Sequence, residues 1–387
     1  MTLPLVAPRR SPASRWAASL AKHMSLMEVL PESYASVGPD ERARRMAAAK
    51  AALGKDLVIL GHNYQQDDVI RWADFVGDSY GLSVEAARTE AKHIVFCGVT
   101  FMAETADILT DGRRNVIMPS MEASCPMAGM AEMVQVQSAW DQLETVLGPD
   151  ALVPVTYMNS YADLKAFTGE KGGLICTSSN AHKAMKWALD TGKKVVFLPD
   201  KHLGHNTAHR LGVKDSEIAR WNAWNRDFGG LTEEAVRDAR VILWEGFCQV
   251  HDRFKLSHVE EIKREHPGIR ILVHPECRRE VVAAADAFGS TTEMAKIIED
   301  SPPGTKWAVG TEIHMVRRLA KENPDKYVVQ LCGELCLDCN AMRQVDPNYL
   351  LWVTESLAYE GRVINRIATE PEERAGAKLA LERMLAL

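Results

Sequence analysis

Residues 56–64 read Asp56-Leu-Val-Ile-Leu-Gly-His-Asn-Tyr64, an apolar run that ends directly in polar and aromatic side chains. The pattern recurs in Ala151-Leu-Val-Pro-Val-Thr-Tyr-Met-Asn159 and in Ile269-Arg-Ile-Leu-Val-His-Pro-Glu276. Short apolar runs of this kind, separated by helical stretches, predict buried strands of parallel sheets. Because one unit is repeated along the chain, the sequence predicts tandem copies of one architecture.

Each copy continues with two further predicted strands. The second strands are expected at His93-Ile-Val-Phe-Cys-Gly98, Gly173-Leu-Ile-Cys-Thr-Ser-Ser-Asn180 and Ala285-Asp-Ala-Phe-Gly-Ser-Thr-Thr292, and the third at 116–119, 241–244 and 327–331, each leading towards a cysteine. The fold class is therefore α/β, with three pseudo-symmetric, Rossmann-like βαβ domains in tandem around a central site. We expect an N-terminal extension over 1–47, a first domain over 48–126 to which C-terminal helices from 341–387 return, a second over 127–249 and a third over 250–340.

The first 45 residues differ from the rest, since no acidic residue precedes Glu28 while Arg9, Arg10 and Arg15 mix with Ser and Ala. Such a segment resembles an organelle transit peptide. A tail that leads into a surface helix over Asp40 to Leu53 explains it equally simply, and we favour the tail and a cytoplasmic protein. The stretch from Arg210 to Arg240 is expected to be a surface insertion in the second domain.

Composition limits the classes of function. The 387 residues carry a formal net charge of −6, and 46% of them are hydrophobic. The basic excess typical of nucleic-acid binding is missing, so we expect no nucleic-acid partner. No stretch approaches the ~20 unbroken apolar residues that span a bilayer, so no membrane association is expected.

Three of the eight cysteines follow the predicted third strands, at Cys125, Cys248 and Cys339. The carboxyl ends of parallel strands are where open α/β sheets bind ligands, so three such ends facing one another would bring three thiolates together. Three thiolates with a vacant fourth position fit either a catalytic zinc or an iron–sulfur cluster with one free iron. The all-sulfur set favours the cluster.

Ten short motifs then identify a resemblance that runs over about residues 50–385. They are Gly61-His-Asn-Tyr-Gln65, Ala73-Asp-Phe-Val-Gly-Asp-Ser79, Phe96-Cys-Gly-Val-Thr-Phe-Met-Ala-Glu104, Ser124-Cys-Pro-Met-Ala128, Tyr157-Met-Asn-Ser160, Cys176-Thr-Ser-Ser-Asn180, Leu198-Pro-Asp-Lys-His-Leu-Gly204, His274-Pro-Glu-Cys277, Gly289-Ser-Thr291 and Gly310-Thr-Glu312. In order and throughout, they resemble the quinolinate synthase family, in its bacterial form. The resemblance implies a [4Fe–4S] cluster acting as a Lewis acid. It also implies condensation of iminoaspartate with dihydroxyacetone phosphate to quinolinate, with loss of phosphate and two waters, in de novo NAD biosynthesis.

The resemblance also implies the roles of individual residues. The cluster ligands are expected at Cys125, Cys248 and Cys339, with Cys332 and Cys336 as alternatives to the last because they are near it in sequence. Substrate-binding residues are expected at His62, Ser79, Asn159, Ser178, His274, Ser290 and Thr291. The strand ends Asp78-Ser79, Thr177-Ser178 and Ser290-Thr291 are each expected to open a helix, where free N–H groups bind anions. Proton transfer is expected from Glu276, the first choice of base, and from Tyr157 and Tyr64.

Two rival functions remain open. The spacing Cys332-x3-Cys336-x2-Cys339 has the form of radical S-adenosylmethionine enzymes, although that reading leaves Cys125 and Cys248 without a role. A non-enzymatic iron–sulfur sensor would use the same cysteines, but the density of polar residues at the strand ends argues against it. Reversible oxidation of Cys332 and Cys336 is a further hypothesis, and an L-aspartate oxidase is an expected partner as the source of iminoaspartate.

Overall fold

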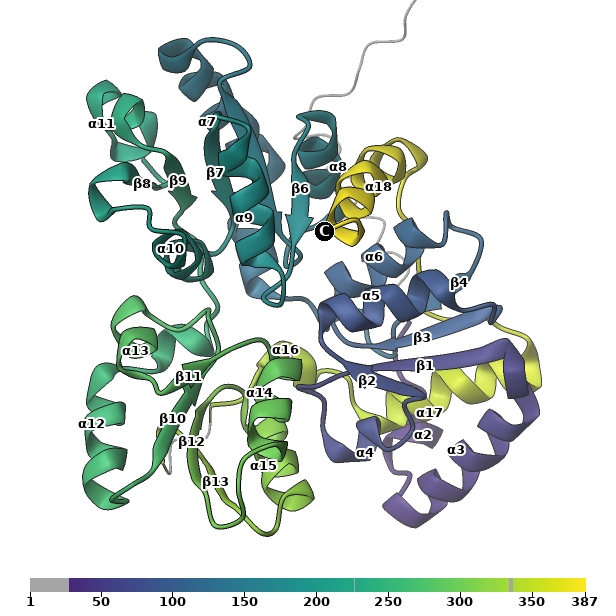
Figure 1. The fold of residues 1–387 in the computed structure, drawn as a ribbon. Helices are drawn as coiled ribbons and strands as arrows, with labels where there is room; N and C mark the ends of the chain where they lie inside the picture. The colour runs from purple at the N-terminus through teal and green to yellow at the C-terminus, as the bar shows by residue number, and fades with distance from the viewer. Residues whose placement is uncertain (1–27, 226, 334–336) are drawn as a thin grey trace, which may run out of the picture.

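The computed structural model describes residues 28–387 except 226 and 334–336, and within them the strands form three separate sheets with helices on their faces (Figure 1). The first has the order β14 (Arg366–Ile367), β4 (Asn115–Ile117), β3 (His93–Cys97), β1 (Leu57–His62), β2 (Phe75–Gly77). The second has the order β6 (Leu174–Cys176), β5 (Leu152–Tyr157), β7 (Lys194–Leu198), β9 (Val241–Trp244), β8 (Ile218–Trp221). The third has the order β11 (Ala287–Phe288), β10 (Arg270–Val273), β12 (Lys306–Gly310), β13 (Tyr327–Gln330). The predicted α/β class with a threefold repeat is confirmed.

One strand order is common to the three sheets, namely β2-β1-β3-β4, β6-β5-β7-β9 and β11-β10-β12-β13, all with parallel pairing. Two additions break the repeat. β14 pairs antiparallel with β4, and β8 pairs parallel with β9. β8 lies in the stretch expected to be an insertion and extends the same edge of its sheet as β14 does in the first, with the opposite direction relative to its neighbour.

The prediction for the second strand of the first repeat was wrong. The counterpart of β6 and β11 is β2, whereas the run beginning at His93 forms β3 and occupies the position of β7 and β12. β2 has only three residues, and its Phe75 and Val76 are 43% and 48% exposed. A short edge strand with exposed side chains produces no buried apolar run, so the pattern passed over it.

Helices cover both faces of the sheets, as βαβ connections require. Around the first sheet lie α2 (Glu32–Ala35), α3 (Pro39–Leu53), α4 (Asp67–Ile70), α5 (Ser79–Arg88) and α6 (Thr100–Leu109). Around the second lie α7 (Met133–Leu147), α8 (Ala162–Glu170), α9 (Ala181–Asp190), α10 (Lys201–Arg210) and α11 (Glu233–Asp238). Around the third lie α12 (Leu256–Glu265), α13 (Arg279–Ala284), α14 (Thr291–Glu299) and α15 (Ile313–Glu322). The chain closes with α16 (Asn340–Arg343), α17 (Pro347–Glu355) and α18 (Pro371–Leu385). None of the described helices is long and apolar enough to cross a bilayer.

The C-terminal helices return to two sheets. α17 packs against α3, and β14 extends the first sheet. α18 instead packs mainly against α8 of the second sheet. Glycine allows this close approach, because a Cβ on Gly169 would lie 1.9 Å from the carbonyl oxygen of Gly376. Residue 47, the expected end of the extension, lies inside α3, and the division into domains stays a prediction.

Candidate active site

The first strand of each sheet ends in a pair of polar or aromatic side chains that are two residues apart. We call these six residues the strand-end cluster: His62, Tyr64, Tyr157, Asn159, His274 and Glu276. In the first and third sheets the strand end is built alike. The backbone N–H of Tyr64 donates to His62 Nδ1 at 3.2 Å, and that of Glu276 donates to His274 Nδ1 at 3.3 Å. Both Nδ1 atoms therefore accept, so the proton of each neutral ring sits on Nε2.

Both histidines are neutral at neutral pH. They are 5% and 3% exposed. Burial lowers the pKa of His62 to about 4, and burial followed by the neighbouring His251 lowers that of His274 to about 3. Their Nε2–H groups are therefore hydrogen-bond donors without a full charge.

A chain of polar contacts runs from Glu276 through His251, a residue to which the sequence analysis gave no role. His251 Nδ1 lies 2.5 Å from Glu276 Oε2, and its Nε2 lies 3.3 Å from Tyr64 Oη and 3.1 Å from Thr311 Oγ1. The His251 ring also stacks on the His274 ring at 4.4 Å between centroids. A carboxylate on Nδ1 holds the imidazole in the tautomer whose Nε2 accepts a proton.

The electrostatics give Glu276 and the tyrosines different roles. Burial raises the pKa of Glu276, but its contacts with His274, His251 and Tyr157 outweigh burial and hold the pKa below its usual value. Burial and then the Glu276 charge raise the pKa of Tyr64 and of Tyr157 well above the usual value. The carboxylate is thus ionised while both phenols keep their protons at neutral pH.

Two buried acceptor atoms of the strand-end cluster are unused. Glu276 Oε1 and Asn159 Oδ1 accept no hydrogen bond from any of the residues that the structure describes. Leaving such atoms buried and unpaired costs about 1–3 kcal/mol each, which a bound polar ligand would relieve.

The three predicted ligand cysteines lie together. Cys125, Cys248 and Cys339 pack against one apolar core and are half-buried, whereas the other described cysteines, 97, 176, 277 and 332, are buried. Burial raises the pKa of Cys125 to about 11 and that of Cys339 to about 12, the latter also through the charge of Cys125. Burial, then Glu276, Cys125 and Cys339, raise the pKa of Cys248 well above its usual value.

This donor set fits a cationic, thiophilic group. Three neighbouring thiolates repel one another, so the three thiols lose their protons only when a cation binds between them. Soft thiolate ligands select iron–sulfur clusters over hard cations, and the set of three leaves one iron of a [4Fe–4S] cluster without a cysteine. Cys248, His251 and Glu276 also place one potential ligand atom each within 4.8 Å of one another.

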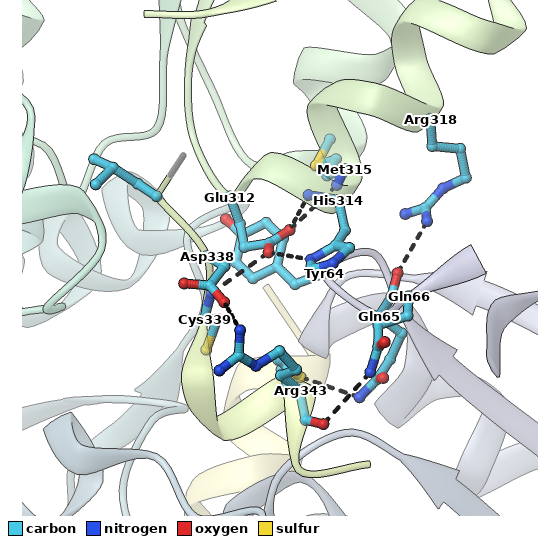
Figure 2. Close-up of polar contacts among 12 residues, drawn as sticks. Tyr64, Gln65, Gln66, Glu312, His314, Met315, Arg318, Asp338, Cys339 and Arg343 are labelled. Atoms are coloured by element: carbon cyan, nitrogen blue, oxygen red, sulfur yellow. Dashed lines mark hydrogen bonds and ion pairs between the residues drawn. The ribbon is translucent and has the colours of Figure 1, made fainter. Parts of the chain in front are cut away.

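Two buried carboxylates hold the loops that carry two of these cysteines. Asp200, which caps α10, accepts from the N–H of Cys248 at 3.2 Å. Glu312, which caps α15, accepts from the N–H of Cys339 at 3.4 Å and from His314 Nδ1 at 2.6 Å (Figure 2). In the first sheet no acid among the described residues binds the N–H of Cys125, and the N–H and hydroxyl of Thr100 donate to the carbonyl of Ala123 at 2.9 and 3.2 Å.

The Cys339 segment is also tied to the end of β1. Arg318 of α15 donates to the carbonyls of Gln65 and Asn63, and Gln66 Nε2 donates to the carbonyl of Arg343 at 3.4 Å (Figure 2). Gln65 Nε2 lies 3.5 Å from Met342 Sδ. These contacts join the third sheet to the first beside the site.

The Ser and Thr strand ends follow the prediction in two sheets. α5 begins at Ser79 and α14 at Thr291. The expectation for Thr177-Ser178 was wrong, since α9 begins only at Ala181. The N–H of Thr177 donates to Asn180 Oδ1 at 2.7 Å, and this side-chain turn delays the helix by one turn.

The expected anion-binding hydroxyls are partly in use. Ser290 Oγ accepts from the N–H of Glu293 at 3.3 Å, and Thr291 Oγ1 accepts from Asn63 Nδ2 at 2.8 Å. Within the described chain the side chains of Ser79 and Ser178 form no hydrogen bond, and Ser178 lines a cavity. An anion at α14 would therefore meet backbone N–H groups before hydroxyls.

Of the two additional cysteines, Cys332 lies in a hydrophobic core and Cys336 lies outside the described residues. Cys332 is buried in the core of the third sheet, with its Sγ 3.4 Å from Gln330 Oε1. Cys336 lies outside the described residues, so the hypotheses that need it, oxidation with Cys332 and the three-cysteine radical motif, are untested by the geometry.

Sequence reasoning missed His251, Thr311, Asp200 and Glu312. The sequence nevertheless contained a feature that could have pointed to each of them. His251 stands three residues after Cys248, while Thr311, Asp200 and Glu312 belong to motifs that carried the resemblance. The partners of His251 and Thr311, however, come from other sheets, and the cysteines bound by Asp200 and Glu312 are 48 and 27 residues away, so no local pattern identifies them.

Fold and site together define a class of protein: an α/β enzyme of three repeated sheets whose polar strand ends meet beside three thiols. Residues 44–386 match the family described as quinolinate synthetase A protein. The chain is 55% identical over 367 residues to a quinolinate synthase of Haloarcula marismortui, which covers 95% of this chain and 97% of that protein. Identity is 54% with the quinolinate synthase of Halobacterium salinarum (95% and 97% covered) and 50% with that of Streptomyces coelicolor (92% and 91% covered).

The chain therefore belongs to the quinolinate synthase family, and its activity is that of quinolinate synthase in de novo NAD biosynthesis. Members of this family are [4Fe–4S] enzymes. The narrower expectation of a bacterial form needs correction, because relatives of such high identity are archaeal as well as bacterial. Membership also leaves the radical-enzyme and sensor readings without support.

Proposed function

We propose that the strand-end cluster is the active site and that it condenses iminoaspartate with dihydroxyacetone phosphate, with loss of phosphate and two waters. The observation that supports this most strongly is the gathering of three half-buried thiols, one following the last repeated strand of each sheet, beside the Glu276–His251 pair.

Cys125, Cys248 and Cys339 would hold the [4Fe–4S] cluster. When bound, the cluster supplies a Lewis acid at the iron that no cysteine holds, which polarises a carbonyl or hydroxyl oxygen. Asp200 and Glu312 position two of the ligands through their backbone N–H groups.

The substrates would be held by neutral donors. The Nε2–H groups of His62 and His274 and the side-chain amide of Asn159 suit carboxylate or phosphate oxygens. Ser79, Ser178, Ser290 and Thr291 belong to the three strand ends, where the N-terminal N–H groups of α5 and α14 favour anions.

Proton transfer would pass through His251. Because Glu276 is ionised and bound to Nδ1, His251 Nε2 can take a proton, and Tyr64 Oη at 3.3 Å is placed to give or relay one. Tyr157, whose phenol keeps its proton beside the Glu276 carboxylate, is a second donor. Glu276, the base expected from the sequence, would thus act in a pair with His251.

The proposal also covers the source of iminoaspartate and the location of the enzyme. Iminoaspartate is made by two-electron oxidation of an amino acid, so an L-aspartate oxidase is the proposed partner. A cytoplasmic location remains part of this proposal.

The experiment uses the anaerobically reconstituted protein with dihydroxyacetone phosphate and freshly generated iminoaspartate. Quinolinate should form only when both substrates are present, with one phosphate released per quinolinate. Phosphate release without quinolinate, or no product from a protein with full iron content, contradicts the proposal.

A further inference from the structure

A groove of about 710 Å³ lies between the second and third sheets, outside the strand-end cluster. We call it the basic groove. One wall comes from α9 and α10, and the other from α13 and the β11–α14 connection (Figure 1). Its lining includes His182, His209, Arg210, Arg279 and Phe288.

Two guanidinium groups line the groove. Arg279 Nη2 lies 3.2 Å from His209 Nδ1, and the Arg210 guanidinium lies 5.8 Å from the centroid of the Phe288 ring. Within the part of the chain that the structure describes, neither arginine forms an ion pair with a carboxylate. Burial and then the charge of Arg210 lower the pKa of His182, so that ring adds no positive charge at neutral pH.

The acidic residues nearby are occupied elsewhere. Asp286 Oδ2 accepts from the N–H of Ile271 at 2.7 Å, and Glu293 Oε2 accepts from the N–H of Ser290 at 2.8 Å. Asp215, on the outer side, accepts from His205 at 2.9 Å. Asp286 and Glu293 keep their charges but are held by these hydrogen bonds and, among the described residues, form no ion pair with Arg210 or Arg279, whose donors stay available to an anion.

The inner lining of the groove borders the active site. Ser178 and Gly289 stand at the strand ends of the second and third sheets, and Pro275 immediately precedes Glu276. Both proposed substrates are dianions, one with two carboxylates and one with a phosphate. The lining also holds Asp286 and Glu293, so the groove attracts anions through the unpaired guanidinium donors and not through a large net charge. Arginine suits both carboxylate and phosphate, because its planar donors match their oxygens in pairs.

We propose that Arg210 and Arg279 form an anion-recruitment site that captures the dianionic substrates in the basic groove and passes them to the strand-end cluster. This inference rests on the proposed function. It assigns the two arginines to capture and not to chemistry, so they should affect binding and association but not the saturated turnover.

The test compares the wild-type holoenzyme with Arg210→Gln, Arg279→Gln and the double variant. Arg220→Gln is the control, because Arg220 is exposed on β8, outside the groove, and its loss changes the net charge equally. With each substrate limiting in turn, the double variant should lose about tenfold in kcat/KM at low ionic strength and keep kcat within about twofold, while its kcat/KM depends less on salt than that of the wild type. A loss confined to one substrate would support the site and identify the dianion it captures.

A second arm does not depend on turnover. Calorimetric titration with inorganic phosphate should give a dissociation constant several-fold higher for the double variant than for wild type and Arg220→Gln. Equal phosphate binding in all three proteins, or kinetic losses no larger than those of Arg220→Gln, overturns the inference while leaving the proposed function standing. Wild-type protein that binds phosphate through the arginines but makes no quinolinate contradicts the proposed function instead.

Discussion

His251 Nδ1 lies 2.5 Å from Glu276 Oε2, although the two residues belong to different sheets. His251 follows β9 of the second sheet, and Glu276 follows β10 of the third. The proposed base therefore forms only when two sheets are correctly placed against each other. Its geometry is a property of their interface.

Replacing His251 by Gln should reduce quinolinate formation by about 10² or more, because Nε2 is the proposed proton acceptor and general base catalysis contributes about 10²–10⁴. The iron content should stay that of the wild type. His258→Gln, a substitution on α12 outside this contact chain, serves as the control and should keep full turnover. Unchanged turnover of an iron-loaded His251→Gln protein would move the role to Tyr157 or Tyr64.

Glu276→Gln preserves shape but removes the charge that fixes the His251 tautomer. We expect turnover to fall by about 10², with normal iron content, because the amide can no longer favour the ring with its proton on Nδ1. Steady-state kinetics over pH, with the exposed Glu280→Gln as the matched control, measures this. Equal activity of the two variants would show that Glu276 has no catalytic part.

Each of the substitutions Cys125→Ala, Cys248→Ala and Cys339→Ala should abolish the visible absorbance of the cluster and the activity, since iron finds no replacement thiolate nearby. Cys176→Ala removes a buried thiol from the core of the second sheet and should retain the cluster. Iron and sulfide analysis of the anaerobic proteins makes the comparison. Full iron content in one of the first three variants would remove that residue from the ligand set.

Acid should lower the stability of the fold through His62, because this side chain binds a proton more readily in the unfolded chain than in the folded one. The usual histidine pKa is about 6.5, and burial lowers that of folded His62 to about 4. Between these values the unfolded chain binds a proton that the folded chain does not, so stability is complete above pH ~6.5 and falls as pH drops towards 4, by about 1.4 kcal/mol per unit.

Proton uptake when the iron-free protein is unfolded at pH ~5 measures this effect directly. Wild type should take up about one proton more than His62→Gln. Identical uptake by the two proteins would mean that folded His62 titrates normally.

The repeated strands were predictable because each carries a buried apolar run followed by polar residues, as at 56–64 and 269–276. β2 was not, since its exposed Phe75 and Val76 bury too little to leave a pattern. β7 and β12 were also missed, although they are largely buried, because only three strands were expected in each repeat and the structure has four. The packing of α18 on α8 could not be predicted either, because it depends on the close approach of Gly169 and Gly376, which are about 200 residues apart in the sequence.

Sequence alone assembled the candidate site only in part. Residues at strand ends, such as His62 and Glu276, could be named because parallel sheets bind ligands there. The contacts of His251 with Glu276 and Tyr64 could not, since they join three sheets. The turn made by Thr177 and Asn180 shows the same limit at short range, because a side-chain hydrogen bond there overrode a plausible helix start.

Because each sheet contributes one cysteine ligand, binding of the cluster stabilises the folded arrangement of the three sheets. A group bound through Cys125, Cys248 and Cys339 stabilises the mutual placement of all three sheets by its own binding free energy, because the ligands come together only in that placement. Conversely, whatever loosens one sheet weakens the hold on iron at the other two. Release of iron and separation of the sheets are therefore coupled in one equilibrium. Asp200 and Glu312 contribute to it, because they bind the backbone N–H groups of two of the three ligand cysteines.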